Sequence, residues 1–307
     1  MTERIGTASR VILRGGEGAF VPVVTLTALI LVVWYLACPP MNAVLPQLAN
    51  VQGLGERYLV AWGLERPVLP APHQVIVELY NSTLGTRLFR QTAEGMVLNP
   101  RNLLFHAWVT LSATLVGFAI GALLGIGLAI AIVHSRVLQK SLMPWIIASQ
   151  TIPILAIAPI IIVALGSIGL TGLIPKSIIS AYLSFFPITI GMVKGFSSAD
   201  SMQLDLMRTY NASRSVTFTK LRWPAALPFL FASLKVSISI SLVGAIVGEL
   251  PTGAQAGLGA RLLSGSYYGQ TVQIWSALFM AAILAALLLA LVSLAERLTL
   301  KAMGARR

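Results

Sequence analysis

Long runs of apolar residues, separated by short polar or charged segments, make up most of the chain. A helix needs about 20 mostly apolar residues to cross a bilayer, because its backbone groups must be paired inside the segment. About six runs reach this length. We expect spans at Phe20–Cys38, Ala107–Val133, Leu142–Leu165, Leu173–Val193, Leu227–Gly248 and Val272–Leu291. The pattern therefore predicts an all-α integral membrane protein.

The segment between the first two runs differs in character, because prolines and mixed charges interrupt it. It contains Pro39, Pro40, Pro67, Pro70 and Pro72. Proline and glycine clusters mark loops, so we expect a large extramembrane loop over residues 39–106, with a short helix near Val75–Leu84. Its stretch 41–66 has no explanation at this level. The chain divides into an N-terminal part (1–38), this loop, a membrane core (107–295) and a basic tail (296–307).

Composition agrees with a membrane protein and excludes several functions. Hydrophobic residues make up 56% of the chain and charged residues 10%, with a mean hydropathy of +0.83. The net charge of +12 comes from basic residues at the ends of apolar runs, which does not fit a nucleic-acid-binding face. The single cysteine, Cys38, and the separated His73, His106 and His134 provide neither a disulfide framework nor metal-ligand spacing. We expect no cofactor in this chain.

Lysine and arginine are distributed unevenly between the two sides of the predicted spans. The N-terminal side holds Arg4, Arg10, Arg14, Arg136, Lys140, Lys194, Arg208, Arg214, Lys220, Arg222, Arg297, Lys301, Arg306 and Arg307. The short opposite loops hold Lys176 and Arg261. Because basic residues concentrate on the cytoplasmic side, we expect both termini to be cytoplasmic and the loop after the first span to be periplasmic.

Two short motifs suggest other functions, but neither matches the pattern that its function requires. "YLACPP" resembles a lipoprotein cleavage site, but the apolar run is long for a signal peptide and proline follows Cys38, which favours a retained span. "GLIPKS" ends like a phosphate-binding loop, but Pro175 stands where glycine is needed and removes a backbone donor. We therefore expect no ATP hydrolysis by this chain.

A polar, basic stretch, "RTYNASRSVTFTKLRWPAALP" at 208–228, separates the fourth and fifth runs. Ser197, Ser198 or Asp200 could cap a short helix before it. Charged residues keep this stretch in water, while Leu206, Tyr210 and Phe218 offer apolar contacts. Such a helix could anchor at the membrane surface or contact a soluble partner, and composition alone favours the anchor.

The spacing from Asp205 to Pro224 resembles the cytoplasmic signature of permease subunits of bacterial ABC importers. In that signature Glu-Ala-Ala is followed at fixed spacing by glycine, a hydrophobic position and Leu-Pro. Asp205 stands at the glutamate and Asn211 at the glycine, and asparagine is the residue after glycine most able to adopt a left-handed turn. Leu206-Met207 and Trp223 depart from the pattern and alter the expected docking surface.

The resemblance covers roughly residues 68–295. "VLPAPHQVIVELY", "GALLGIGLAIAI", "TIPILAIAPIIIVALGSIGLTGLIPKSII" and "GAQAGLGARL" are similar to the nitrate, sulfonate and taurine branch of that family. It implies a second permease subunit, two ATPase subunits that bind ATP and Mg, and a periplasmic binding protein, all at the bacterial inner membrane. Because closed assemblies are most often twofold homodimers, we expect the second permease subunit to be identical. The coupling residues that it implies are Asp205, Arg208, Tyr210, Asn211, Ala212, Ser213, Arg214, Phe218 and Pro224.

Two features of the spans bear on packing and on a solute pathway. Gly117, Gly121 and Gly125 form a stripe that favours close helix packing, with a moving contact as the alternative. In the third span Pro144, Pro153 and Pro159 interrupt the backbone pairing, which indicates a pathway lining or a simple kink. The pathway candidates are Ser149, Gln150, Thr151, Pro153, Tyr182, Ser184, Ser241 and Glu249.

Glu249 is an acidic residue near the outer end of the fifth span. It is either functional or a brace for the glycine-rich bend that follows, and Arg261 is the one cation partner that the sequence suggests. Ser237, Ser239 and Ser241 alternate, so they cannot share one helical face. Lys235 is expected to snorkel toward the cytoplasm.

Three functions compete at this stage. One is a secondary transporter, which usually needs ionisable residues at mid-membrane, and almost none are evident. Another is a membrane-embedded enzyme or scaffold, and an enzyme would need convergent reactive groups, which are not evident. The permease of an ATP-driven importer accounts for the polar stretch and is the leading prediction. Its substrate is open between sulfonates, taurine, nitrate and pyrimidine-like or vitamin-like heterocycles.

Overall fold

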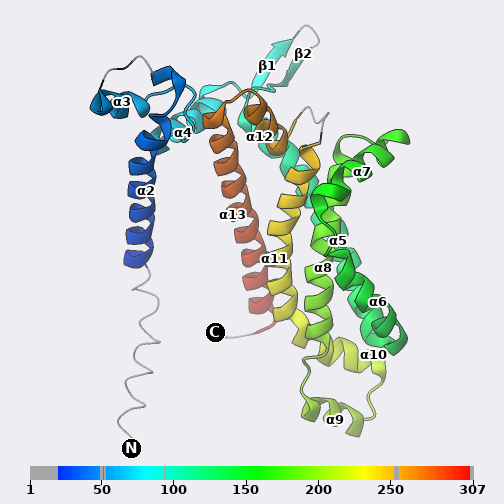
Figure 1. Ribbon diagram of the computed structural model, residues 1–307. Coiled ribbons are helices and arrows are strands. Elements are labelled where there is room, and N and C mark those ends of the chain that lie inside the picture. Colours follow the sequence, from blue (N-terminus) through cyan, green and yellow to red (C-terminus); the bar gives the residue numbers. More distant parts are fainter. Residues whose placement is uncertain (1–19, 49–50, 52, 93–94, 252–255, 305–307) are drawn as a thin grey trace, which may run out of the picture.

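The computed structural model describes residues 20–48, 51, 53–92, 95–251 and 256–304. In this part of the chain, five helices are long and apolar enough to cross a membrane, and one bent pair of helices makes a sixth candidate (Figure 1). The expectation of about six spans is confirmed. The terminal residues Arg4, Arg10, Arg14, Arg306 and Arg307 lie outside the described residues.

The long helices run side by side along one direction (Figure 1). They are α2 (Phe20–Asn42), α5 (Leu103–His134), α8 (Leu173–Phe196), α11 (Trp223–Glu249) and α13 (Thr271–Ala302). The bent pair is α6 (Arg136–Ser149) and α7 (Ile154–Ser167). Shorter helices are α3 (Leu54–Ala61), α4 (Pro72–Tyr80), α9 (Ser201–Thr209), α10 (Arg214–Thr217) and α12 (Leu258–Tyr267).

The two ends of the molecule differ. One end, which we call the hairpin end, carries α3, α4 and an antiparallel hairpin of β1 (Phe89–Thr92) and β2 (Gly95–Leu98) (Figure 1). The opposite end, the α9 end, carries α9 and α10. The short helix expected near Val75–Leu84 is present as α4 and a π-helical turn over Asn81–Gly85, but the sequence analysis did not anticipate the hairpin.

Helices α5, α8 and α11 pack closely because small residues line their contacts. A Cβ on Gly121 would lie 3.0 Å from Ala181 O, and one on Gly125 would lie 2.8 Å from Phe185 O. On Gly117 it would lie 2.6 Å from Ser177 O. Since lipid gives no hydrophobic drive between helices, such close backbone approach and interhelical hydrogen bonds hold them together.

Buried serines add hydrogen bonds to the same interface. Ser180 Oγ and Ser241 Oγ lie 2.5 Å apart, and Ser241 Oγ also lies 3.1 Å from the carbonyl of Thr114 on α5. Ser237 donates to the carbonyl of Ser184 at 3.0 Å. Interhelical bonds of this kind contribute on average about 0.6 kcal/mol each in membranes. Together they fix the register of three helices.

The third span breaks at one proline, not at three. Helices α6 and α7 meet at 97°, with Pro153 in an extended conformation directly before α7. Pro144 and Pro159 lie inside helices that continue past them, so each removes one backbone donor without ending its helix. Ser149 and Thr151 hydroxyls donate to carbonyls three residues earlier, which satisfies part of the broken backbone.

The first helix continues beyond the prolines at which the sequence analysis ended it. It runs to Asn42 and contains Pro39 and Pro40. Proline cannot donate to the carbonyl four residues earlier, but Trp62 Nε1 donates to the Tyr35 carbonyl that Pro39 leaves free, at 3.2 Å. The indole therefore compensates for part of the lost helical pairing.

Asn42 organises the loop that had no explanation. Its side chain is fully buried, donates to the carbonyls of Ala61 and Leu69, and accepts from the amides of Val68 and Leu69 at 2.9 and 3.0 Å. The long 41–66 stretch is thus folded back onto the end of α2. Trp34 on α2 stacks on Trp275 and Phe279 of α13, with ring centroids 4.8 and 6.0 Å away.

We predict that Gly121→Val destabilises the protein by about 1–3 kcal/mol, because overpacking must separate α5 from α8. The matched control is Gly127→Val on the same helix, where an added Cβ meets nothing within 4 Å. Thermal unfolding in detergent should show a lower midpoint for the first variant than for the second. Equal midpoints would contradict close packing at this stripe.

Candidate functional site

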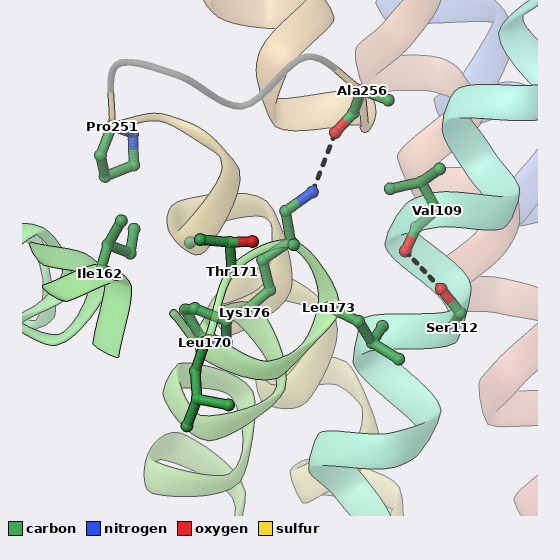
Figure 2. A pocket seen from close by; sticks show the side chains of 13 residues that line it. Val109, Ser112, Ile162, Leu170, Thr171, Leu173, Lys176, Pro251 and Ala256 are labelled. Atoms are coloured by element: carbon green, nitrogen blue, oxygen red, sulfur yellow. Dashed lines mark hydrogen bonds between the residues drawn. The ribbon is translucent and has the colours of Figure 1, made fainter. Parts of the chain in front are cut away.

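A cavity of about 730 Å³ opens at the hairpin end between α5, the end of α7, the start of α8 and the end of α11 (Figure 2). Apolar side chains form most of its wall. They include Val109, Ile162, Leu170 and Leu173. Lys176 is the one charged residue among the described residues that line it. The cavity thus presents an apolar surface with a single cationic group.

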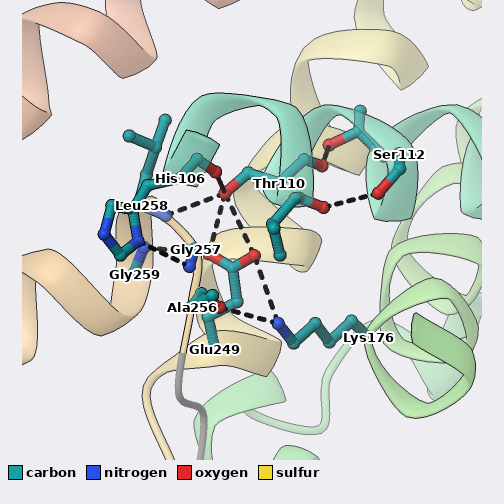
Figure 3. Close-up of polar contacts among 11 residues, drawn as sticks. His106, Thr110, Ser112, Lys176, Glu249, Ala256, Gly257, Leu258 and Gly259 are labelled. Carbon is teal, nitrogen blue, oxygen red and sulfur yellow. Dashed lines mark hydrogen bonds and ion pairs between the residues drawn. The ribbon is translucent and has the colours of Figure 1, made fainter. Parts of the chain in front are cut away.

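Lys176 is held by two partners. Its Nζ donates to the carbonyl of Ala256 at 2.9 Å and lies 3.6 Å from a carboxylate oxygen of Glu249 (Figure 3). The sequence analysis named Arg261 as the partner of Glu249, and this is wrong. The segment "GLIPKS" places a basic residue one turn into a predicted span. This position could have identified Lys176 as a partner of Glu249.

Glu249 is fully buried and is surrounded by donors. The hydroxyl of Thr110 lies 2.9 Å from one carboxylate oxygen, and the amide of Gly259 donates to the same oxygen at 2.9 Å. Leu258 N donates to the Thr110 hydroxyl at 2.9 Å. A buried carboxylate is tolerated only when paired and hydrogen-bonded in this way.

His106 extends this cluster toward the start of α12. Its Nδ1 accepts from the amide of Gly257 at 3.0 Å (Figure 3). Nε2 therefore carries the proton and donates to the carbonyl of Pro100 at 2.8 Å. Gly257 has φ +129, and a Cβ there would overlap the Glu249 carboxylate. We call Glu249, Lys176, Thr110 and His106 the Glu249 network. It ties α5, α8, α11 and the start of α12 together.

Arg261 faces a different carboxylate. Burial raises the pKa of Glu78 on α4, and the positive charge of Arg261 opposes that rise. Burial also lowers the pKa of the Arg261 guanidinium, and the charge of Glu78 opposes that fall. Arg261 therefore interacts electrostatically with Glu78 of α4.

The opposite end carries the polar stretch singled out in the sequence. Asp200 caps α9 by accepting from Met202 N at 3.1 Å, as expected for one of the three cap candidates. Asp205 and Arg208 form an exposed ion pair at 2.8 Å. Asn211 has φ +47 and is the one non-glycine residue with positive φ in the described part of the chain. The left-handed turn predicted there is confirmed.

The residues around this turn connect α9 to α10. The amide of Ala212 donates to the carbonyl of Met207, and Ser213 caps α10 by accepting from Val216 N at 3.3 Å. Arg214 is the first residue of α10, and Pro224 lies in the first turn of α11. Met202, Leu206 and Tyr210 are 77%, 54% and 75% exposed, so residues 200–217, which we call the α9 segment, present apolar side chains that nothing in the described chain covers.

Phe218 is half-buried, so it is less exposed than these three side chains. Its ring packs inside a cluster of rings, 5.0 Å from Phe196, 6.2 Å from Trp223 and 4.9 Å from His134. These residues come from the ends of α8 and α5 and the start of α11. We call them the aromatic cluster. It joins the α9 segment to three long helices.

The predicted pathway residues lie in different environments. Ser184 and Ser241 are fully buried in helix contacts. Ser149, Gln150, Thr151 and Pro153 lie at the break between α6 and α7, and Tyr182 donates to the carbonyl of Ser149. Gln150 Nε2 is buried there and lacks a hydrogen-bond partner in the described part of the chain.

Lys235 forms an ion pair that the sequence did not predict. Its Nζ lies 2.5 Å from Glu296 on α13, and the two side chains are 32% and 16% exposed. The carboxylate satisfies the ammonium between the two helices. The charge was visible in the sequence, but its partner lies 61 residues away in the chain.

Comparisons with known proteins agree with the sequence analysis. The sequence model of the family "binding-protein-dependent transport system inner membrane component" matches residues 121–303. The matched range includes the C-terminal part of α5 and all of α6 to α13, and therefore covers both the α9 segment and most of the cavity wall.

Several curated relatives share this region. A "probable ABC transporter permease protein" of Haemophilus influenzae is 32% identical, covering 56% of this chain and 69% of the relative. The "riboflavin transport system permease protein RibX" of Chloroflexus aurantiacus is 33% identical, covering 64% and 71%. The "putative aliphatic sulfonates transport permease protein SsuC" of Bacillus subtilis is 25% identical, covering 76% and 78%. The predicted sulfonate-type branch is among these relatives.

A solved structure shows the same fold. It is described as an inward-facing conformation of the MetNI methionine ABC transporter, and one of its chains superposes with a TM-score of 0.54. The sequence identity is 18%, and the match covers 64% of this chain and 94% of that chain.

We predict that Thr110→Val destabilises the protein by about 1–3 kcal/mol, because it removes one donor from the buried Glu249 and leaves Leu258 N without its acceptor. Thr189→Val is the matched control: Thr189 is equally buried, but its hydroxyl donates only to Phe185 O in its own helix. Thermal unfolding of both variants in detergent tests this. A control as unstable as Thr110→Val would show that the network adds nothing.

Proposed function

Because the chain belongs to the family of binding-protein-dependent transport system inner membrane components, we propose that it forms the membrane-spanning pathway of an ATP-driven importer. Two copies of this chain associate, and two ATPase subunits that bind ATP and Mg attach at the α9 end. A periplasmic binding protein delivers the solute at the hairpin end. Both termini then lie in the cytoplasm, and the chain resides in the bacterial inner membrane.

The α9 segment carries this proposal. It exposes Met202 and Leu206 on α9 and Tyr210 directly after this helix, and these side chains offer an apolar face for an ATPase surface. Asp205 and Arg208 stay in water beside that face. A short helix that presents apolar anchors to a groove is a common mode of helix recognition.

Coupling then proceeds through contacts and involves no chemistry in this chain. The turn at Asn211 joins α9 to α10, and the aromatic cluster joins α10 and the following π-helical turn to α5, α8 and α11. Because packed side chains transmit displacement with little compression, a movement of α9 reaches the long helices. No catalytic residue is proposed.

The charged residues of the spans argue against a self-sufficient secondary transporter. In the described spans the two ion pairs link Lys176 to Glu249 and Lys235 to Glu296. Neither carboxylate is left without a partner to bind a coupling ion at mid-membrane. In the described part of the chain, no cluster of metal-ligating side chains forms either.

For the solute we propose a small organic molecule or anion. The relatives named above are described as transporting riboflavin and aliphatic sulfonates, which are an organic ring compound and an organic anion. Ser149, Gln150, Thr151, Pro153 and Tyr182 at the break of the third span remain the candidates for lining the pathway. Ser184, Ser241 and Glu249 would reach it only if the helices separate.

We predict that a nucleotide-binding ATPase copurifies with the chain in mild detergent and is lost on Asn211→Pro, because proline cannot adopt φ +47. Asn211→Gly is the matched control, since glycine accepts positive φ, and it should retain the ATPase. Mass spectrometry of the purified complexes measures this. A wild-type chain that carries no ATPase yet transports alone when reconstituted would overturn the importer proposal.

We further predict that Tyr210→Ala and Phe218→Ala fail in different ways. Tyr210 is exposed directly after α9, so its loss should weaken ATPase binding, whereas Phe218 lies in the aromatic cluster. Phe218→Ala should keep the bound ATPase and lower solute-stimulated ATP hydrolysis several-fold, since it breaks the ring contacts to α5 and α8. Equal loss of ATPase from both variants would refute a separate transmission role.

A further inference from the structure

We propose that the cavity at the hairpin end receives an uncharged ring compound with a hydrogen-bond acceptor, and that the Lys176–Glu249 pair discriminates against free anions there. The inference rests on the proposed transport function and concerns the solute class of that pathway. It is carried by three properties of the cavity: its apolar wall, its single cation, and the carboxylate behind that cation.

The first property is shape and polarity. Val109, Ile162, Leu170 and Leu173 come from α5, α7, the connection after α7, and α8, so apolar surface faces the cavity from several directions (Figure 2). A volume of about 730 Å³ lies within the range of small-ligand pockets. Such walls bind flat apolar faces well. They offer a small, strongly hydrated anion no hydrogen bonds to compensate the free-energy cost of its desolvation.

The second property is the donor that Lys176 provides. An ammonium group has three N–H donors. One donates to Ala256 O, and one is directed to Glu249, so the third remains for a solute. One fixed donor in an apolar cavity suits a carbonyl or a ring nitrogen and gives orientation to a ring bound against the wall.

The third property is charge compensation. Glu249 lies 3.6 Å from the ammonium and is fully buried, so the pair adds no net charge to the cavity. The partial charges of two helix ends cancel as well. Helix α8 begins beside the cavity at Leu173 with a positive partial charge, and α11 ends there at Glu249 with a negative one. An anion at Lys176 would be repelled by the carboxylate that already pairs with it.

The test measures protection of a cysteine in the cavity. Ser112 lines it, and the natural Cys38 is fully buried, so a Ser112→Cys chain has one accessible thiol among the described positions. The full chain with its copurified partners is reconstituted in nanodiscs and labelled with N-ethylmaleimide, in the presence of uracil or nicotinamide as uncharged rings, or methanesulfonate or nitrate as anions. We expect the rings to protect at concentrations about tenfold lower than the anions, the discrimination typical of one hydrogen bond to a charged group.

Glu249→Gln in the same background leaves Lys176 without its counter-charge while keeping an acceptor for Gly259 N. It should reverse the order, so that methanesulfonate protects better than uracil. The matched control is Glu296→Gln, which frees Lys235 at a distant ion pair and should leave the order of the probes unchanged. A second variant, Lys176→Met with Glu249→Gln, avoids an unpaired charge and should weaken protection by the rings while still excluding the anions.

The proposal is overturned if anions protect the Ser112→Cys chain as well as the rings do, if no probe protects it, or if Glu249→Gln leaves the order unchanged. Retention of the ATPase at the α9 end is recorded in every preparation. A chain that keeps its ATPase but shows no ring preference refutes only the solute class, whereas loss of the ATPase from the wild type refutes the importer function.

Discussion

A carboxylate cannot lie out of contact with water unless donors surround it, and this constraint at Glu249 organises the hairpin end of the molecule. The donors come from α5, α8 and the start of α12, while Glu249 itself is the last residue of α11. Four helices must therefore meet at one point. Gly257 and Gly259 are required beside it, because a side chain at either position would collide with Glu249 or with the backbone of α11.

The remainder of the core follows from close helix approach. Glycines on α5 admit the serines of α8, and serines on α11 bond to the backbones of both neighbours. The two ends of the molecule are thus connected by helices that cannot slide past each other without breaking hydrogen bonds. Because the packed helices are rigid, a movement of the α9 segment can be transmitted along them to the cavity.

Local signals in the sequence were sufficient for part of this structure. Run length located the spans, residue chemistry gave Asp200 as one of three cap candidates, and the resemblance together with residue chemistry predicted the left-handed turn at Asn211. What the sequence did not reveal depended on contacts between residues far apart in the chain: Lys176 with Glu249, Lys235 with Glu296, Phe218 in its cluster, and Trp62 supporting α2 past its prolines. Periodicity and composition carry no information on such pairs.

Helix α2 lies outside the region matched by the family model and is attached at one end only. Trp34 and the buried Asn42 and Cys38 fix it at the hairpin end, whereas the side chains from Val21 to Val33 are mostly exposed. Lipid contacts apolar side chains of any shape. The sequence of this stretch must therefore be apolar and long enough to span the bilayer, but its side chains need not fit a complementary protein surface. Across evolution, we expect its leucines, isoleucines and valines to interchange freely, while the residues near Trp34 and Asn42 drift slowly.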